Sequence, residues 1–172
     1  MTISDAEGTS VSPRAIARGL LIGPILFRRW FATVVDLLVL MMIVIAPSPL
    51  LGAPLYDRTI LVWVALAVLY FPVTEGFWGR TLGKLLTGTV VVDRRGRAPG
   101  LLKASLRTLT RLIEVNPVLI GGIPAGLAVC LSKERQRLGD MWADTYVIPA
   151  SDLARARKAD AQSSNAIAQV FD

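Results

Sequence analysis

The chain has 172 residues, of which 53% are hydrophobic and 19% charged, and its net charge is +6. Soluble domains usually carry about 25% charged residues, and here the charges gather at the ends of long apolar runs, which indicates a bilayer environment. With no histidine and one cysteine, the chain excludes intrachain disulfides, histidine metal sites and triad-type catalysis. We therefore expect no enzyme activity, cofactor or metal. We also expect no nucleic-acid partner, because the arginines flank membrane segments, where the positive-inside rule already explains them.

The first element in chain order is a polar N-terminal segment. Residues 1–13 are small and polar, and the apolar stretch that follows is broken by Gly23-Pro24. This stretch is too short to span a bilayer. We predict that residues 1–25 form a disordered or interfacial segment.

Two long apolar runs predict membrane-spanning helices. The first runs from Trp30 to about Ala46, and the second from about Ile60 to Phe77. Segment 79–113 contains eight basic residues and one acidic residue. By the positive-inside rule, this segment and the N-terminus are expected on the cytoplasmic side.

The remainder of the chain predicts shorter elements. The β-branched run at 87–93 and the segment 145–148 are predicted to be strands that pair with each other. Residues 101–114 show helical periodicity, and the apolar run 118–131 is short for a crossing. Basic residues flank 118–131 on both sides, so we expect a re-entrant helical hairpin that turns near Asn116-Pro117. The alternative is a third crossing.

Asp36 is the charge that the first span should least tolerate. It lies seven residues after Arg29, so both side chains project from one helix face, about 10 Å apart along the axis. An ionised carboxylate inside a bilayer costs roughly 2.5–3.5 kcal/mol, so each group needs a partner from elsewhere. Asp36 is interpreted either as an ion pair with Arg107 or Arg111 or as a group that binds or relays a cation. Arg29 is interpreted as an interfacial anchor or as a network member.

Two further acids lie near the predicted membrane surface. Glu75, at the end of the second span, either joins Asp36 or is a solvated helix-end acid. Asp140 either pairs with Arg29 or caps a helix. These residues, with the arginines of the 101–114 helix, form the candidate charge network.

Three blocks of the sequence resemble the RDD family of bacterial membrane proteins, named for one arginine and two aspartates. The blocks are RRWFATVVD, EGFWGRTLGKLLTGTVVVD and RQRLGDMWADTYVI. Residues that match the family pattern are Arg29, Ala32, Asp36, Glu75, Gly79, Thr81, Gly83, Lys84, Gly88, Asp140, Ala143 and Thr145. The chain departs from the pattern at Leu82, where proline is common, and at Asp144, where glycine is more frequent. The resemblance implies location in a bacterial plasma membrane, and some family members are reported to transport ligands or exchange sodium for protons.

We thus predict an all-α membrane protein: a small multi-pass helical bundle with two spans, a membrane-associated helical pair and a short cytoplasmic β element. The RDD-like domain is placed at residues 26–149, followed by a charged tail at 150–172. One functional hypothesis is transport of ions or small ligands by membrane-embedded acids. The alternative is a non-transporting scaffold or accessory subunit of a membrane complex, in which the charges are structural. The expected partners are the lipid bilayer and a second copy or another membrane protein. The candidate residues are Arg29, Asp36, Glu75, Lys84, Arg107, Arg111 and Asp140.

Overall fold

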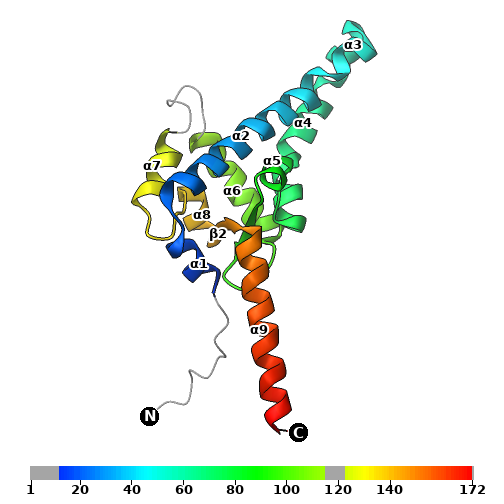
Figure 1. The fold of residues 1–172 in the computed structure, drawn as a ribbon. Helices are drawn as coiled ribbons and strands as arrows, with labels where there is room; N and C mark the ends of the chain where they lie inside the picture. The colour runs from blue at the N-terminus through cyan, green and yellow to red at the C-terminus, as the bar shows by residue number, and fades with distance from the viewer. Residues whose placement is uncertain (1–11, 115–122, 172) are drawn as a thin grey trace.

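The computed structural model of the protein describes residues 12–114 and 123–171. Two long helices run side by side away from a more globular body, and the last helix leaves that body in the opposite direction (Figure 1). The elements are α1 (Pro13–Gly19), α2 (Ile22–Ile45), α3 (Pro47–Leu51), α4 (Ala53–Trp78), α5 (Leu82–Leu86), β1 (Thr89–Asp93), α6 (Gly100–Glu114), α7 (Ile123–Leu131), α8 (Leu138–Trp142), β2 (Thr145–Pro149) and α9 (Ala150–Phe171).

The two predicted spans correspond to α2 and α4, and the chain is an all-α membrane protein. Both helices begin earlier than the sequence suggested, with Pro24 and Pro54 in their first turns. Proline is tolerated there because N–H groups in the first turn have no hydrogen-bond partner within the helix. The stretches Ile22–Leu51 and Ala53–Trp78 are long and apolar enough to cross a bilayer. Only 6% and 22% of their apolar windows are buried by the rest of the chain, so most of each helix faces outward.

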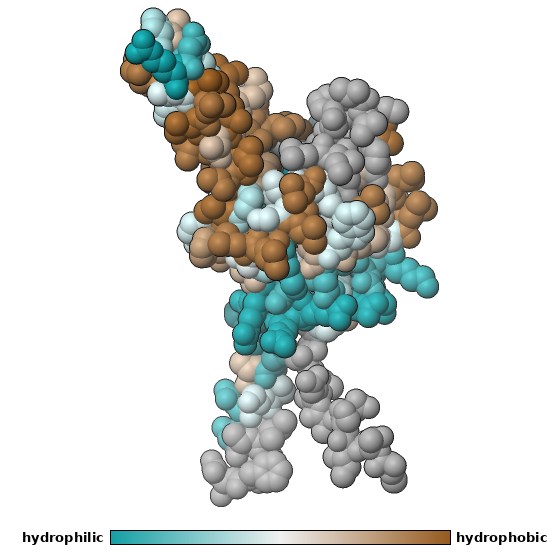
Figure 2. All heavy atoms as spheres, turned by 180° about the vertical axis from the view of Figure 1, so that it is seen from behind, coloured by the Kyte–Doolittle hydropathy of each residue, from teal (hydrophilic) through white to brown (hydrophobic). Residues whose placement is uncertain are grey.

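Helix α6 turns its apolar face outward and its basic face inward, which is the reverse of an amphipathic helix in a soluble protein. Its leucines point outward, with Leu102 86% and Leu109 60% exposed, whereas Arg107 on the opposite face is 2% exposed. Exposed apolar side chains also occur on α5, α7 and α8, and hydrophobic surface continues from the spans onto the body (Figure 2). Because such a surface is unfavourable in water, this apolar collar on α5 to α8 is suited to lipid.

A two-stranded antiparallel sheet, with Val91 opposite Val147, anchors the polar end of the body. This pairing confirms the predicted association of the two strands. One face of the sheet packs with Ala17 of α1 and Leu153 of α9 in a small apolar core. Side chains alternate between faces along a strand, so the opposite face, which includes Thr145, is turned toward the charged interior described below.

Three expectations about the flanking segments can be compared with the structure. Of the N-terminal residues 1–25, those from Ser12 onward form α1 and the start of α2, and Ala17 is 1% exposed against the sheet. The tail after residue 150 is the helix α9. Helices α6 and α7 pack against each other, as a hairpin requires, but the expected turn at Asn116-Pro117 lies outside the described residues, so the hairpin stays a prediction.

The exposed leucine face of α6 gives a test of its surroundings. We expect a nitroxide attached at Leu102→Cys, in a Cys130→Ser background, to be relaxed more by dissolved oxygen than by a water-soluble nickel complex, because lipid concentrates oxygen and excludes the complex. The measurement is power-saturation electron paramagnetic resonance in lipid vesicles. A label at Ser163→Cys on α9, an exposed position, should show the reverse preference. Equal nickel accessibility at both positions would show that the collar faces water.

Candidate functional site

Glu75, in the last turn of α4, is surrounded by three cations. Its Oε1 accepts hydrogen bonds from Lys84 Nζ at 2.5 Å and Arg111 Nη2 at 2.6 Å, and its Oε2 accepts from Arg107 Nε at 3.0 Å. The residue is 0% exposed, so its interpretation as a solvated helix-end acid is wrong. A fully buried carboxylate requires this compensation, because an isolated buried charge is strongly destabilising.

Asp140 in α8 is the second anionic centre. Its Oδ2 accepts from Arg29 Nη2 at 2.5 Å, and its Oδ1 accepts from Arg107 Nη1. The predicted pairing of Asp140 with Arg29 is therefore confirmed. The capping interpretation also holds, because Oδ2 accepts the backbone N–H of Arg137 at the start of α8, at 3.1 Å. Burial alone would raise the pKa of Asp140, but the guanidinium groups of Arg107 and Arg29 hold it well below its usual range.

Arg107 connects the two acids. Besides Glu75 and Asp140, its Nη1 donates to Thr145 Oγ1 of β2 at 2.6 Å. One side chain from α6 thereby joins α4, α8 and the sheet. Burial acts to lower the pKa of Arg107, but the carboxylates of Asp140 and Glu75 outweigh it and raise the pKa, so this guanidinium is a permanent cation.

Asp36 does not pair with an arginine, and the expectation that Arg107 or Arg111 would be its partner is wrong. Its Oδ1 accepts from the Tyr70 hydroxyl and from the backbone N–H of Gly83, both at 2.9 Å, and its Oδ2 accepts from Thr81 Oγ1 at 2.6 Å. Neutral donors therefore solvate this carboxylate, which is 3% exposed. Arg29 and Asp36 point from one face of α2 to different partners, as their axial separation required.

The local sequence explains how α5 reaches Asp36. Gly83 lies so close to α2 that a Cβ at this position would sit 2.1 Å from the carbonyl oxygen of Ala32, which places its N–H against the carboxylate. Leu82, where the family often has proline, donates its N–H to the Tyr70 hydroxyl at 3.0 Å. Proline has no N–H to donate, so this departure adds a hydrogen bond that holds Tyr70 against Asp36.

The second departure, Asp144, concerns only the turn between α8 and β2. Its φ is +52°, a left-handed conformation that favours glycine and that aspartate tolerates better than most residues. The side chain also pairs with Arg94 of the loop after β1 at 2.5 Å. The family's glycine preference at this position follows from the backbone conformation.

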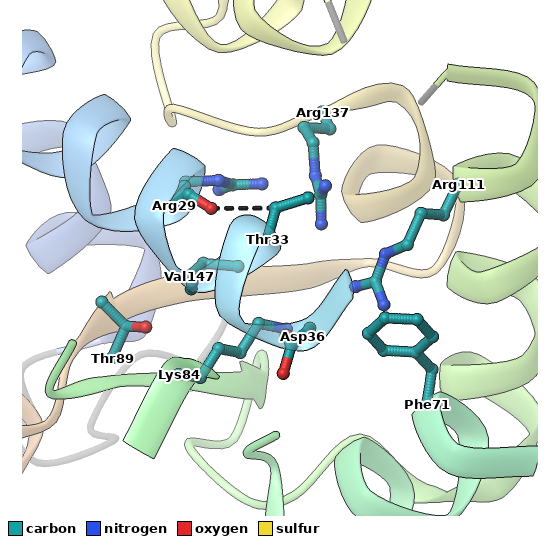
Figure 3. Close-up of a pocket in the computed structure, with 10 residues that line it drawn as sticks. Arg29, Thr33, Asp36, Phe71, Lys84, Thr89, Arg111, Arg137 and Val147 are labelled. Carbon is teal, nitrogen blue, oxygen red and sulfur yellow. Dashed lines mark hydrogen bonds between the residues drawn. The ribbon is translucent and has the colours of Figure 1, made fainter. Parts of the chain in front are cut away.

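A small cavity of about 20 Å³ lies among these groups, enough for about one water molecule. Arg29, Arg111 and Arg137 converge on it from α2, α6 and the start of α8, with Asp36 and Lys84 on the opposite side (Figure 3). Burial is the largest influence on the pKa of Lys84 and lowers it to about 7, although Glu75 opposes the shift. Among the described residues, Arg107 Nη2 and Arg111 Nη1 are buried without a hydrogen-bond partner.

Positive charge exceeds negative charge in this buried cluster. Sequence reasoning reached Lys84 only through the family pattern and did not include Arg137. Among the side chains that the structure describes, three acids lie among five basic groups. They are Asp36, Glu75 and Asp140 against Arg29, Lys84, Arg107, Arg111 and Arg137. Residues 12–114 and 123–171 contain no group of three acidic or cysteine side chains placed to hold a metal ion. The chemistry of the cluster therefore favours anions over cations.

The structure brings all seven candidate residues into this one region. Arg137 and Tyr70 were absent from the candidate set. Arg137 lies within the third family block, and its position three residues before Asp140 was the available signal. Tyr70 sits in an apolar run, and no local pattern distinguishes its hydroxyl from that of any interfacial tyrosine.

Comparison with known proteins agrees with the three sequence blocks. Residues 24–144, more than two thirds of the chain, match the RDD family. No curated protein and no solved structure shows significant similarity to the chain. The matched range includes Arg29, Asp36, Glu75, Arg107 and Asp140.

The charge imbalance predicts unequal effects of substitutions on the two sides of one ion pair. Glu75→Gln leaves three buried cations without their shared carboxylate and should destabilise the protein by about 3–5 kcal/mol. Lys84→Met removes surplus positive charge and leaves Arg107 and Arg111 on Glu75, so its cost should be smaller by about 2 kcal/mol or more. Thermal unfolding in detergent micelles measures both. Asp57→Asn, at an exposed position near the start of α4, is the matched control and should change stability by less than about 0.5 kcal/mol. A larger loss for Lys84→Met than for Glu75→Gln would contradict the imbalance.

The partners of Asp36 predict a specific energetic coupling. Asp36→Asn and Thr81→Val remove two ends of one hydrogen bond, so a double-mutant cycle should give a coupling energy of about 0.5–3 kcal/mol. Asp36→Asn and Arg107→Gln remove groups that do not contact each other, so their effects should add within about 0.5 kcal/mol. Strong coupling of Asp36 to Arg107 instead would restore the ion-pair hypothesis.

Proposed function

The chain belongs to the RDD family, and from this premise we propose that it is a non-transporting scaffold or accessory subunit of a membrane complex. The observation that carries the proposal is the state of the three buried acids. Each of the six carboxylate oxygens of Asp36, Glu75 and Asp140 accepts at least one hydrogen bond from the protein. Through these hydrogen bonds the three carboxylates join α2, α4, α5, α6 and α8.

Cation transport by the same acids is the competing hypothesis, and the electrostatics disfavour it. A cation that entered the cluster would meet five basic side chains, two of them with unpartnered guanidinium nitrogens among the described residues. It would also have to displace Arg107 or Arg111 from Glu75, and breaking a buried ion pair costs about 3–5 kcal/mol. A carrier needs acids that exchange partners readily, whereas these acids are held from several elements at once.

The exposure of the spans supports a role in association. In a bundle that encloses a pathway, much of each helix is buried by its neighbours, yet α2 and α4 leave most of their apolar residues uncovered. Lipid or helices of other chains must cover these faces.

We include in the proposal a plasma-membrane location with the N-terminus, α5 to α8 and α9 on the cytoplasmic side, supported by the basic residues of segment 79–113.

The decisive experiment measures transport by the purified protein. We expect vesicles that contain the wild-type chain and a pH-sensitive dye to show the same proton flux as empty vesicles when sodium or potassium gradients are imposed. Asp36→Asn should leave that flux unchanged and should lower the yield of folded protein, because it replaces one of the two acceptor oxygens with an NH2 donor where the other groups donate. A saturable, cation-dependent flux that Asp36→Asn abolishes would overturn the scaffold proposal in favour of transport.

A further inference from the structure

An apolar groove between α2 and α7 adjoins the basic cluster. Its volume is about 620 Å³, and its walls are mostly hydrophobic side chains, with Arg29 and Arg137 among them. The same two arginines also border the small cavity, so the groove leads from the outer surface toward the buried charges. Its apolar lining includes Leu26, Trp30, Val34, Ala125, Gly126 and Val129.

Among the described side chains of the cluster, Arg137 is the basic group whose closest ion pair is the longest. Its side chain is 12% exposed, and among the acidic side chains that the structure describes it pairs with Asp140, whose Oδ2 lies 4.0 Å from its Nε. That oxygen already accepts from Arg29 Nη2 and from the backbone N–H of Arg137. Burial and the positive charge of Arg29 lower the pKa of Arg137 to about 9. Figure 3 shows this side chain reaching into the space beside Thr33 and Arg111. A guanidinium in this position attracts an anion.

We propose that the groove binds an anionic phospholipid, whose phosphate lies at Arg137 beside Arg29 and one of whose acyl chains lies between α2 and α7. The planar guanidinium presents paired donors that match phosphate oxygens. The surplus of positive charge in the cluster favours an anionic headgroup over a zwitterionic one, whose own cation would meet these arginines.

The shape of the groove identifies the ligand as a lipid rather than a free anion. A phosphate ion would leave most of the 620 Å³ apolar volume unfilled. Along α2, the wall continues from Arg29 to Leu37, about 12 Å at a rise of about 1.5 Å per residue. This length accommodates a substantial part of an acyl chain. Trp30 also borders the groove, as expected near the headgroup level of a bilayer.

The membrane supplies such a ligand directly. The collar of exposed leucines on α5 to α8 places the body against lipid, and the groove opens on that same surface. A lipid phosphate at Arg137 would offset part of the excess positive charge while its chain covers the uncovered faces of α2 and α7. The proposal therefore joins two independent observations, the weakly paired Arg137 and the apolar groove.

The test uses the full-length chain in detergent with phosphatidylglycerol or phosphatidylcholine added. Native mass spectrometry measures bound lipid, and thermal unfolding measures stabilisation. We expect phosphatidylglycerol to bind and stabilise more strongly than phosphatidylcholine. Arg137→Gln, which leaves the ion pairs of Asp140 with Arg29 and Arg107 intact, should weaken phosphatidylglycerol binding about tenfold or more, the effect of losing one charge-assisted hydrogen bond. Arg155→Gln, on the exposed surface of α9, should leave binding unchanged.

A second variant tests the acyl-chain half of the site. Among the described residues, a Cβ on Gly126 would meet Leu26 Cδ1 alone, at 3.9 Å, so Gly126→Phe should fill the groove without disturbing the arginines. We expect this variant to lose phosphatidylglycerol binding and to retain its folded state. Equal binding of the two lipids, unchanged binding in both variants, or equal stabilisation by inorganic phosphate alone would each overturn the proposal.

Discussion

The rest of the structure depends on the ion pairs and hydrogen bonds of one buried side chain, Arg107. It lies on α6 and bonds Glu75 of α4, Asp140 of α8 and Thr145 of β2. Through Asp140 the network continues to Arg29 of α2. A single buried guanidinium therefore sets the relative positions of both spans and the sheet. Charged groups are costly to bury unless all partners are present, so the elements assemble as one polar core or do not assemble stably.

This polar core reverses the usual arrangement of a globular protein. Arginines, lysine and acids occupy the interior, and leucines such as Leu102 cover the outside of α6. In lipid this inversion is favourable, because apolar side chains lose nothing by facing acyl chains and the polar groups satisfy one another internally. Within the described part of the chain, the sheet, with α1 and α9 on one face, builds a conventional apolar core. The boundary between the two kinds of packing marks the polar end of the molecule.

The proposed function follows from how completely the acidic side chains are hydrogen-bonded. Acids that transport cations have to release and rebind them, whereas Asp36 is fixed by a tyrosine, a threonine and a backbone N–H. What the cluster leaves unused is positive charge, concentrated at Arg137. The scaffold proposal and the lipid proposal both rest on this asymmetry. The first rests on the hydrogen-bonded carboxylates, and the second on the weakly paired guanidinium of Arg137 beside an apolar groove.

The sequence by itself determined the membrane class, the two spans, the paired strands, the family and seven members of the charge network, but not Arg137. These follow from apolar run length, β-branched runs and three blocks of characteristic residues. It also implied that Arg29 and Asp36 need different partners, because their spacing along one helix is fixed. Tertiary structure alone decided which partners they have. Charge complementarity suggested an arginine for Asp36, but the close approach that Gly83 permits brings hydroxyls and an N–H there instead, and Arg107 goes to Glu75 and Asp140. Partner choice depends on how helices distant in sequence are packed, and no local pattern encodes that geometry.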